Sequence, residues 1–146
     1  MKLNIKNYYS KVDNNLLLHQ SIHIINLDTP GRENISPSEE SLQVAFISLA
    51  KGKTFVPHKH LIHDRNMPMA QESWVVINGK VEVTYYDIND EILQKVTLNK
   101  GECTITYRGG HNYLALEENT HVYELKTGPY LGQIYDKEFI KLTKKD

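Results

Sequence analysis

The chain of 146 residues has one cysteine, no long apolar run and almost no net charge. Cys103 alone cannot form an internal disulfide, which argues against a secreted disulfide scaffold and is compatible with a reducing compartment. No apolar stretch approaches the roughly 20 residues of a membrane helix, and the first residues lack the basic and apolar regions of a signal peptide. We therefore expect a cytoplasmic protein with no membrane partner.

Charge and composition also restrict the partners. The formal net charge is −1, and the 17 Lys and Arg residues are balanced by 18 Asp and Glu residues. The lysines are dispersed, and the tail 141–146 is too short for a nucleic-acid-binding arm. No repeat, low-complexity segment or linker divides the chain, whose length suits one domain. We expect no nucleic-acid partner.

From residue 42 the sequence alternates between short apolar runs and turn residues, which indicates an all-β sandwich or barrel. We predict strands over 4–9, 21–26, 42–49, 54–60, 73–78, 80–87, 92–98, 102–107, 113–116 and 120–126. Asn78-Gly79 suits a type I′ hairpin turn. Ser36 either begins a polar connector or caps a short helix, and His19 and His23 are expected at the surface or at an interface.

Three parts of one domain follow from this pattern. Residues 1–41 contain the N-terminal strands and a connector, residues 42–127 form the barrel, and residues 128–146 are a tail rich in aromatics. We expect this tail to pack on the barrel or on a partner. A small β-domain can expose sheet edges, which a second copy would cover, so we expect a homodimer.

The segment 52–79 contains the densest set of possible metal ligands. His58 and His60 are two residues apart, so in an extended strand both imidazoles point to the same face. Glu72 opens the next apolar run, and His111 follows two glycines after a later strand. Imidazole and carboxylate together suit a divalent ion such as Fe, Mn, Ni, Zn or Co. The alternative is that these side chains are solvated and the glycines serve only the turn.

At these residues the chain resembles the cupin superfamily, whose double-stranded β-helix is a jelly-roll barrel. Five residues separate Gly52 from His58, His60 follows at the HxH spacing, and six residues separate Glu72 from Gly79, as in the first cupin motif. The spacer between His60 and Glu72 is longer than is usual in the family. In the second motif Tyr107 replaces the usual proline, and His111 comes one residue early. The resemblance implies that His58, His60, Glu72 and His111 are the metal ligands.

The later runs resemble small single-domain cupins that accompany bacterial surface-polysaccharide and nucleotide-sugar pathways. This implies a metal-dependent isomerase or epimerase of a sugar or nucleotide sugar, in which the ion polarises a carbonyl or a hydroxyl-ketone pair. Tyr107, Tyr113 and His63 are the candidates for proton transfer, Arg108 for binding an anionic group, and Trp74 for core packing or sugar stacking. An Fe(II)-dependent dioxygenase and a non-catalytic metal- or sugar-binding module remain alternatives.

Overall fold

The computed structural model describes residues 2–26, 28–57, 69–128 and 137–140, and all of their regular secondary structure is β-strand. The all-β prediction is confirmed. The strands are β1 (Lys2–Tyr9), β2 (Leu17–Asn26), β3 (Gly31–Asn34), β4 (Ala45–Ser48), β5 (Glu72–Asn78), β6 (Lys80–Tyr86), β7 (Ile92–Asn99), β8 (Cys103–Thr106), β9 (Gly110–Ala115) and β10 (His121–Lys126). No described segment is a helix long and apolar enough to cross a membrane.

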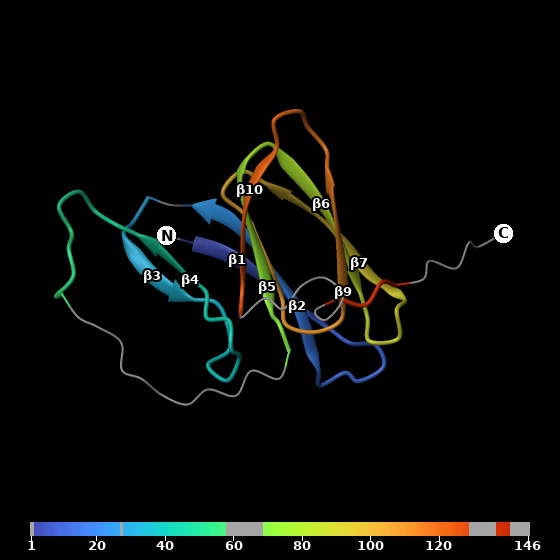
Figure 1. Cartoon of the computed structure of the whole chain (residues 1–146). Coiled ribbons are helices and arrows are strands. Elements are labelled where there is room, and N and C mark those ends of the chain that lie inside the picture. The colour runs from blue at the N-terminus through green and yellow to red at the C-terminus, as the bar shows by residue number, and fades with distance from the viewer. Residues whose placement is uncertain (1, 27, 58–68, 129–136, 141–146) are drawn as a thin grey trace.

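The strands form three sheets, arranged as layers (Figure 1). The central sheet has the order β1-β2-β8-β5-β10, and the other two are β7-β6-β9 and the hairpin β3-β4. All strand pairs are antiparallel. Within the described residues none of the sheets closes into a barrel, so the jelly-roll prediction stays a prediction.

Two hydrophobic clusters hold the layers together, one on each face of the central sheet. The inner cluster lies between the central sheet and β7-β6-β9 and is centred on Val76, Val83 and Tyr85. The outer cluster contains Ile22 and Ile105, and it is covered by side chains from residues 42–46. Each fully buried aliphatic side chain contributes on the order of 2 kcal/mol. The middle strands β2, β8 and β5 are therefore largely buried, whereas the edge strands β1 and β10 are mostly exposed.

Several local predictions were wrong. β5 and β6 belong to different sheets, so Asn78-Gly79 is a corner between layers and not a hairpin turn. Gly79 has φ 76°, and a Cβ there would collide with Thr120, which explains why this corner requires glycine. Residues 54–57 of the predicted strand 54–60 are not in a strand, and residues 58–60 lie outside the described residues. β3 was not among the predicted strands, and of the two alternatives at Ser36 the structure has the connector, because no helix follows it.

Candidate active site

A pocket of about 900 Å³ lies next to the inner face of the central sheet. Its walls come from β5, β8, β9 and β10, from the corner after β6 and from the described part of the C-terminal tail. The charged, histidine and aromatic side chains of its lining include Glu72, Trp74, Arg108, His111, Tyr113, Glu124, Lys126 and Lys137. Residues 137–140 of the tail line this pocket, whereas 129–136 and 141–146 lie outside the described residues, so the packing of the whole tail stays a prediction.

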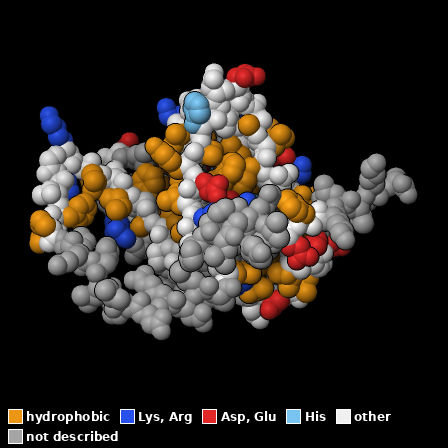
Figure 2. All heavy atoms as spheres, in the orientation of Figure 1, with side chains coloured by type: hydrophobic (Ala, Val, Ile, Leu, Met, Phe, Trp, Pro, Cys, Tyr) orange, Lys and Arg blue, Asp and Glu red, His pale blue; other side chains and the backbone are white. Residues whose placement is uncertain are grey.

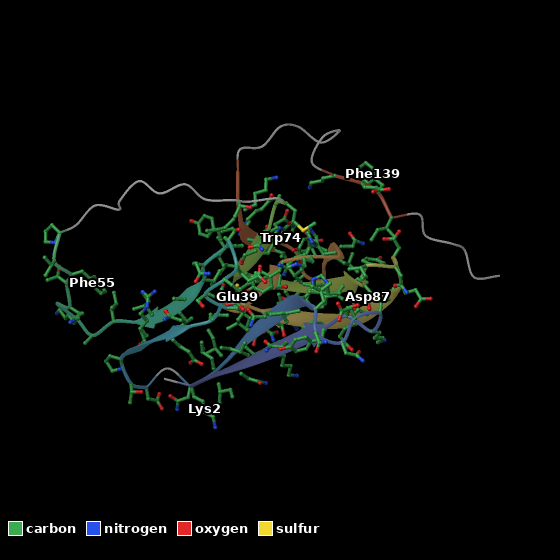
Figure 3. The ribbon with its side chains drawn as sticks, turned by 90° about the horizontal axis from the view of Figure 1, so that it is seen from below. Lys2, Glu39, Phe55, Trp74, Asp87 and Phe139 are labelled. Carbon is green, nitrogen blue, oxygen red and sulfur yellow. The ribbon has the colours of Figure 1, made fainter. Side chains whose placement is uncertain are left out.

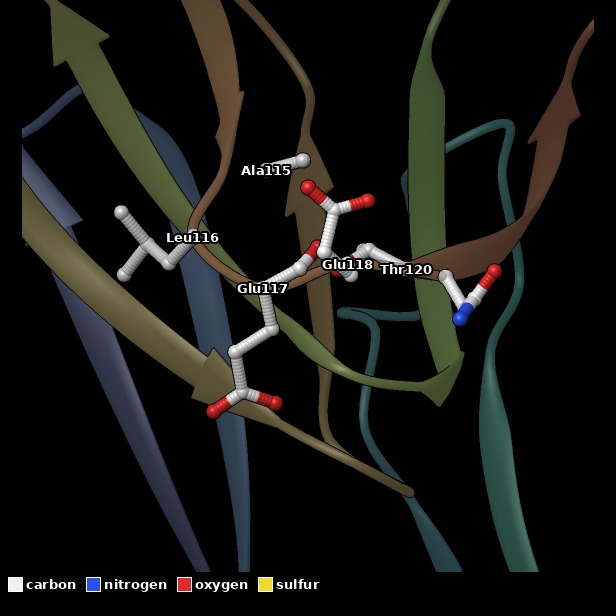
Figure 4. A pocket seen from close by; sticks show the side chains of 6 residues that line it. Ala115, Leu116, Glu117, Glu118 and Thr120 are labelled. Atoms are coloured by element: carbon white, nitrogen blue, oxygen red, sulfur yellow. The ribbon is translucent and has the colours of Figure 1, made fainter.

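A second hollow, of about 530 Å³, lies at the turn between β9 and β10 (Figure 4). It is lined only by the six consecutive residues from Ala115 to Thr120. Glu117 and Glu118 supply the carboxylates of this hollow, and Glu117 forms an ion pair with Lys80 at 3.2 Å.

Glu72 and His111 meet in the larger pocket, although 39 positions separate them in the chain. Glu72 is the first residue of β5 in the central sheet, and His111 is on β9 in the opposite sheet. The Glu72 Oε1 and His111 Nε2 atoms are 3.2 Å apart. With Nε2–H donating to the carboxylate, the Nδ1 atom of a neutral His111 is the unprotonated one. That Nδ1 is buried and has no hydrogen-bond partner among the described residues.

An aromatic pair lies beside these two residues. The rings of Trp74 and Tyr113 are stacked, with centroids 3.7 Å apart and planes 11° from parallel. The Trp74 indole N–H donates a 3.0 Å hydrogen bond to Glu72 Oε1, and the Tyr113 ring is 5.0 Å from that of His111. The Tyr113 hydroxyl is buried, again without a partner in the described part of the chain. The half-buried Trp74 lies among the strands of the sheets, whereas Phe55 lies away from them in the segment after β4 (Figure 3).

The surroundings favour the ionised form of Glu72. Burial alone would raise the pKa of this carboxyl group. The hydrogen bond and charge of His111, the charge of Lys137 and the Trp74 hydrogen bond outweigh burial and lower the pKa below its usual value. Burial raises the pKa of the Tyr113 hydroxyl, and the nearby Glu72 charge raises it further. The site therefore combines an acceptor-only carboxylate, an imidazole and a protonated phenol.

Two of the four predicted metal ligands are thus adjacent. Glu72 Oε1 and His111 Nε2, 3.2 Å apart, would both be available to one divalent ion if Nε2 gave up the proton that it donates to the carboxylate. His58 and His60 lie outside the described residues, as does the proposed proton-transfer residue His63. Within the ranges that the structure describes, no group of three or more His, Cys, Asp or Glu side chains is placed to hold a metal ion. The role of all four as ligands stays a prediction.

The side chains of Tyr107 and Arg108 already have partners within the fold. The Tyr107 side chain is in the outer cluster, where its hydroxyl donates to Gln20 Oε1 at 2.6 Å. Burial raises the pKa of Tyr107 to about 12. Arg108 forms a 2.7 Å ion pair with Glu40. Tyr113 is consequently better placed than Tyr107 to transfer a proton beside Glu72, and Arg108 already has an acidic partner.

A second carboxylate–histidine pair lies at the other end of β8. Glu102 Oε1 is 3.1 Å from His23 Nδ1, and His23 Nε2 is 3.0 Å from Ser21 Oγ. The other oxygen of Glu102 accepts the Asn99 backbone N–H at 2.7 Å. Both nitrogens of this imidazole therefore have partners.

His19 was expected at the surface or at an interface, and this expectation was wrong. It is fully buried, with Nδ1 at 3.1 Å from Thr106 Oγ1, Nε2 at 3.1 Å from the Tyr86 carbonyl and its ring stacked on Tyr85. Burial lowers the pKa of His19 to about 4. The residue is a neutral part of the core.

Two contributors to the pocket were missed or undervalued in the sequence. Trp74 is two residues after Glu72, and in a strand this spacing puts both side chains on one face, so alternation could have assigned it to the pocket. Lys137 belongs to the tail, and no local pattern connects it with Glu72.

Comparison of this chain with protein-family models, with curated proteins and with solved structures found no match.

Proposed function

We propose that the chain is a cupin-like, metal-dependent isomerase or epimerase that acts on a small polar substrate, a sugar or nucleotide sugar. The observation that carries this proposal is the meeting of Glu72 and His111 at 3.2 Å in the wall of a pocket of about 900 Å³. The described residues thus bring together a carboxylate and an imidazole from two separate sheets.

The ligands would be His58, His60, Glu72 and His111, and the divalent ion would supply Lewis-acid polarisation of a substrate carbonyl. The remaining roles belong to the chain itself. Tyr113, with a protonated hydroxyl that lacks a partner among the described residues, is suited to donate a hydrogen bond or a proton to a substrate oxygen. Trp74 shields one side of Glu72 and holds its carboxylate in position.

The most direct test does not require the product to be known. We expect the metal content of protein purified without chelator to be close to one divalent ion per chain. The protein would then be incubated in D₂O with a panel of sugars and nucleotide sugars, and deuterium entering beside a carbonyl would be followed by NMR. Isomerases and epimerases that abstract this proton exchange it with solvent.

The matched variants are Glu72→Gln and Glu82→Gln. Glu72→Gln removes the pocket carboxylate charge and should abolish both metal binding and deuterium incorporation. Glu82 is on β6 in the opposite sheet, where it forms an ion pair with Lys95, so Glu82→Gln should retain both. Stoichiometric metal without exchange of any substrate would favour the non-catalytic binding module, and exchange that survives in Glu72→Gln would contradict the proposal.

We also propose that the protein is a homodimer. β10 is an edge strand of the central sheet, and its outward side chains Tyr123 and Leu125 are 65% and 49% exposed. Hydrophobic side chains are also visible on the face over β9 and β10 (Figure 2). An exposed apolar edge strand can pair with another chain. Light scattering after size exclusion should give twice the chain mass, and Tyr123→Lys should shift the mass toward the monomer.

A further inference from the structure

The carboxylate of Glu40 joins two segments that are far apart in the chain. Glu40 belongs to the connector between β3 and β4. Its Oε1 accepts a 2.7 Å hydrogen bond from the Arg108 guanidinium, and its Oε2 accepts a 2.6 Å hydrogen bond from Gln71 Nε2. The Glu40 side chain is only 8% exposed, so water competes little for these contacts. Both oxygens of one carboxylate are therefore in use.

The partners of Glu40 require two acceptors at this position. Gln71 Oε1 accepts the Leu42 backbone N–H at 2.7 Å, so the Gln71 amide nitrogen must face Glu40. The guanidinium of Arg108 also presents only donors. A carboxylate meets both demands, whereas an amide side chain of the same length would supply one acceptor and one donor.

These two partners lie just before the two members of the Glu72–His111 pair. Gln71 directly precedes Glu72, so its side-chain contacts hold the backbone at the point where β5 begins. Arg108 precedes His111 by three positions, and two glycines, which stiffen the backbone least, fill the gap. Glu40 thus fixes the start of β5 and the entry into β9 relative to each other.

We propose that Glu40 is a positioning residue, which keeps Glu72 and His111 in contact by tying their two segments together. Its use in the reaction rests on the proposed function, whereas the geometry that it maintains can be measured without metal or substrate. Groups that bind a metal or a substrate must be held within about 0.5 Å of their productive geometry. The contact of this pair joins strands of two separate sheets, so a change at Glu40 should alter it through the two anchored segments.

The indole N–H of Trp74 reports on the position of Glu72. It donates a 3.0 Å hydrogen bond to Glu72 Oε1, and Trp74 is the one tryptophan of the chain, so a single indole resonance is expected in the proton–nitrogen NMR spectrum. Glu40→Gln is nearly isosteric and should fold. In this variant the resonance should move upfield, and the indole N–H should exchange with solvent about two- to tenfold faster, as when one hydrogen bond is weakened.

Two control variants keep this result specific. Glu39→Gln makes the same substitution at the exposed neighbouring residue, which accepts from Ser38 Oγ at 3.3 Å, and it should leave the resonance in place. Ser36→Ala loosens the same connector, because the Ser36 hydroxyl accepts the Val44 backbone N–H at 2.9 Å, but it keeps the carboxylate of Glu40. If Glu40→Gln moves the resonance no further than Glu39→Gln, or if Ser36→Ala moves it as far, the inference is overturned.

The affinity for Mn²⁺ connects this geometry with the proposed function. Free Mn²⁺ gives an electron paramagnetic resonance signal that is lost on binding, so titration yields a dissociation constant. Glu40→Gln should bind Mn²⁺ about 10- to 100-fold more weakly than the wild type, as when other groups that orient a ligand are lost. Equal affinity in the two proteins would overturn the inference and leave the proposed function standing. If the indole resonance moves but neither protein binds Mn²⁺ or another divalent ion, Glu40 keeps its positioning role and the metal-dependent function falls.

Discussion

The described part of the chain contains two carboxylate–histidine pairs of nearly equal length, and they differ in what surrounds them. Glu102 and His23 are 3.1 Å apart, and Glu72 and His111 are 3.2 Å apart. In the first pair Ser21 occupies the second imidazole nitrogen. In the second pair, the nitrogen of His111 that does not face Glu72 is Nδ1, and it has no partner among the described residues. This pair lines a pocket.

This difference separates a structural pair from a candidate functional one. A buried polar group without a hydrogen bond costs roughly 1–3 kcal/mol, so folding alone gives no reason to keep His111 Nδ1 unpartnered. A satisfied network such as that of Glu102 rigidifies the sheet and leaves no atom for a ligand. Distance between the two partners is thus a poor indicator of function, and the state of the remaining donors and acceptors is a better one.

The largest expected effect tests this contrast through metal binding. Glu72→Gln should weaken divalent-ion binding by at least about 100-fold, more than is typical of groups that only orient a ligand. Glu102→Gln should leave the affinity within about twofold, because Glu102 interacts with a satisfied network outside the pocket. Isothermal titration with Mn²⁺ or Zn²⁺ measures both. Equal losses in the two variants would remove the distinction drawn here.

A third histidine, His19, lies in the core and should make the free energy of unfolding depend on pH. Burial lowers the pKa of His19 to about 4 from its ordinary value near 6.5, so the unfolded chain binds the proton more readily. The native state therefore loses stability as pH falls from about 6.5 to about 4, and the loss between pH 7 and pH 5 should be about 2 kcal/mol. Urea unfolding at these two pH values measures the loss.

The control for this prediction is His19→Gln, which retains a polar side chain that cannot titrate. Its free energy of unfolding should fall less with acid than that of the wild type, whatever its stability at neutral pH. An identical pH dependence in both proteins would show that His19 is not the acid-sensitive group.

The Glu102–His23 pair should contribute more to the free energy of unfolding than the Glu72–His111 pair does. Glu102→Gln weakens the charge-assisted contacts with His23 and the Asn99 backbone, and we expect the free energy of unfolding to fall by about 1–2 kcal/mol. Glu72→Gln should lower it by a smaller amount, because desolvation of the Glu72 carboxylate offsets much of what its contacts with His111 and Trp74 contribute. Urea denaturation of both variants at pH 7 decides this, and the reverse order would assign the structural role to Glu72.

The sequence predicted most strands after residue 72 and named both members of the Glu72–His111 pair, for physical reasons that can be stated. Alternation of apolar and polar residues is a local property, so most strands from 73 to 126 were placed within a few residues. The partnership of Glu72 with a histidine near 111 followed from family-like spacing, and the structure brings these two side chains together. His58, His60 and His63 remain predictions, since they lie outside the described residues.

What could not be predicted depends on contacts between distant segments. Asn78-Gly79 has the composition of a hairpin turn, but composition does not determine which sheet the following strand joins. His19 is a core residue because Thr106 and the Tyr86 carbonyl satisfy its ring, and neither is near it in the chain. Lys137 enters the pocket through the packing of Ile140 on Gly110, which no local pattern reveals.

The smallest expected effect concerns Trp74, whose indole N–H also contacts Glu72. Trp74→Phe keeps an aromatic ring against Tyr113 and removes the N–H that donates to Glu72 Oε1. We expect the free energy of unfolding to fall by about 0.5–1 kcal/mol, the usual net contribution of one hydrogen bond, measured by circular dichroism because the variant has no tryptophan. Trp74→Leu also removes the ring stacking and should cost about 1 kcal/mol more. If the two variants lose the same stability, the ring stacking contributes nothing measurable, and Trp74 supports Glu72 through its N–H alone.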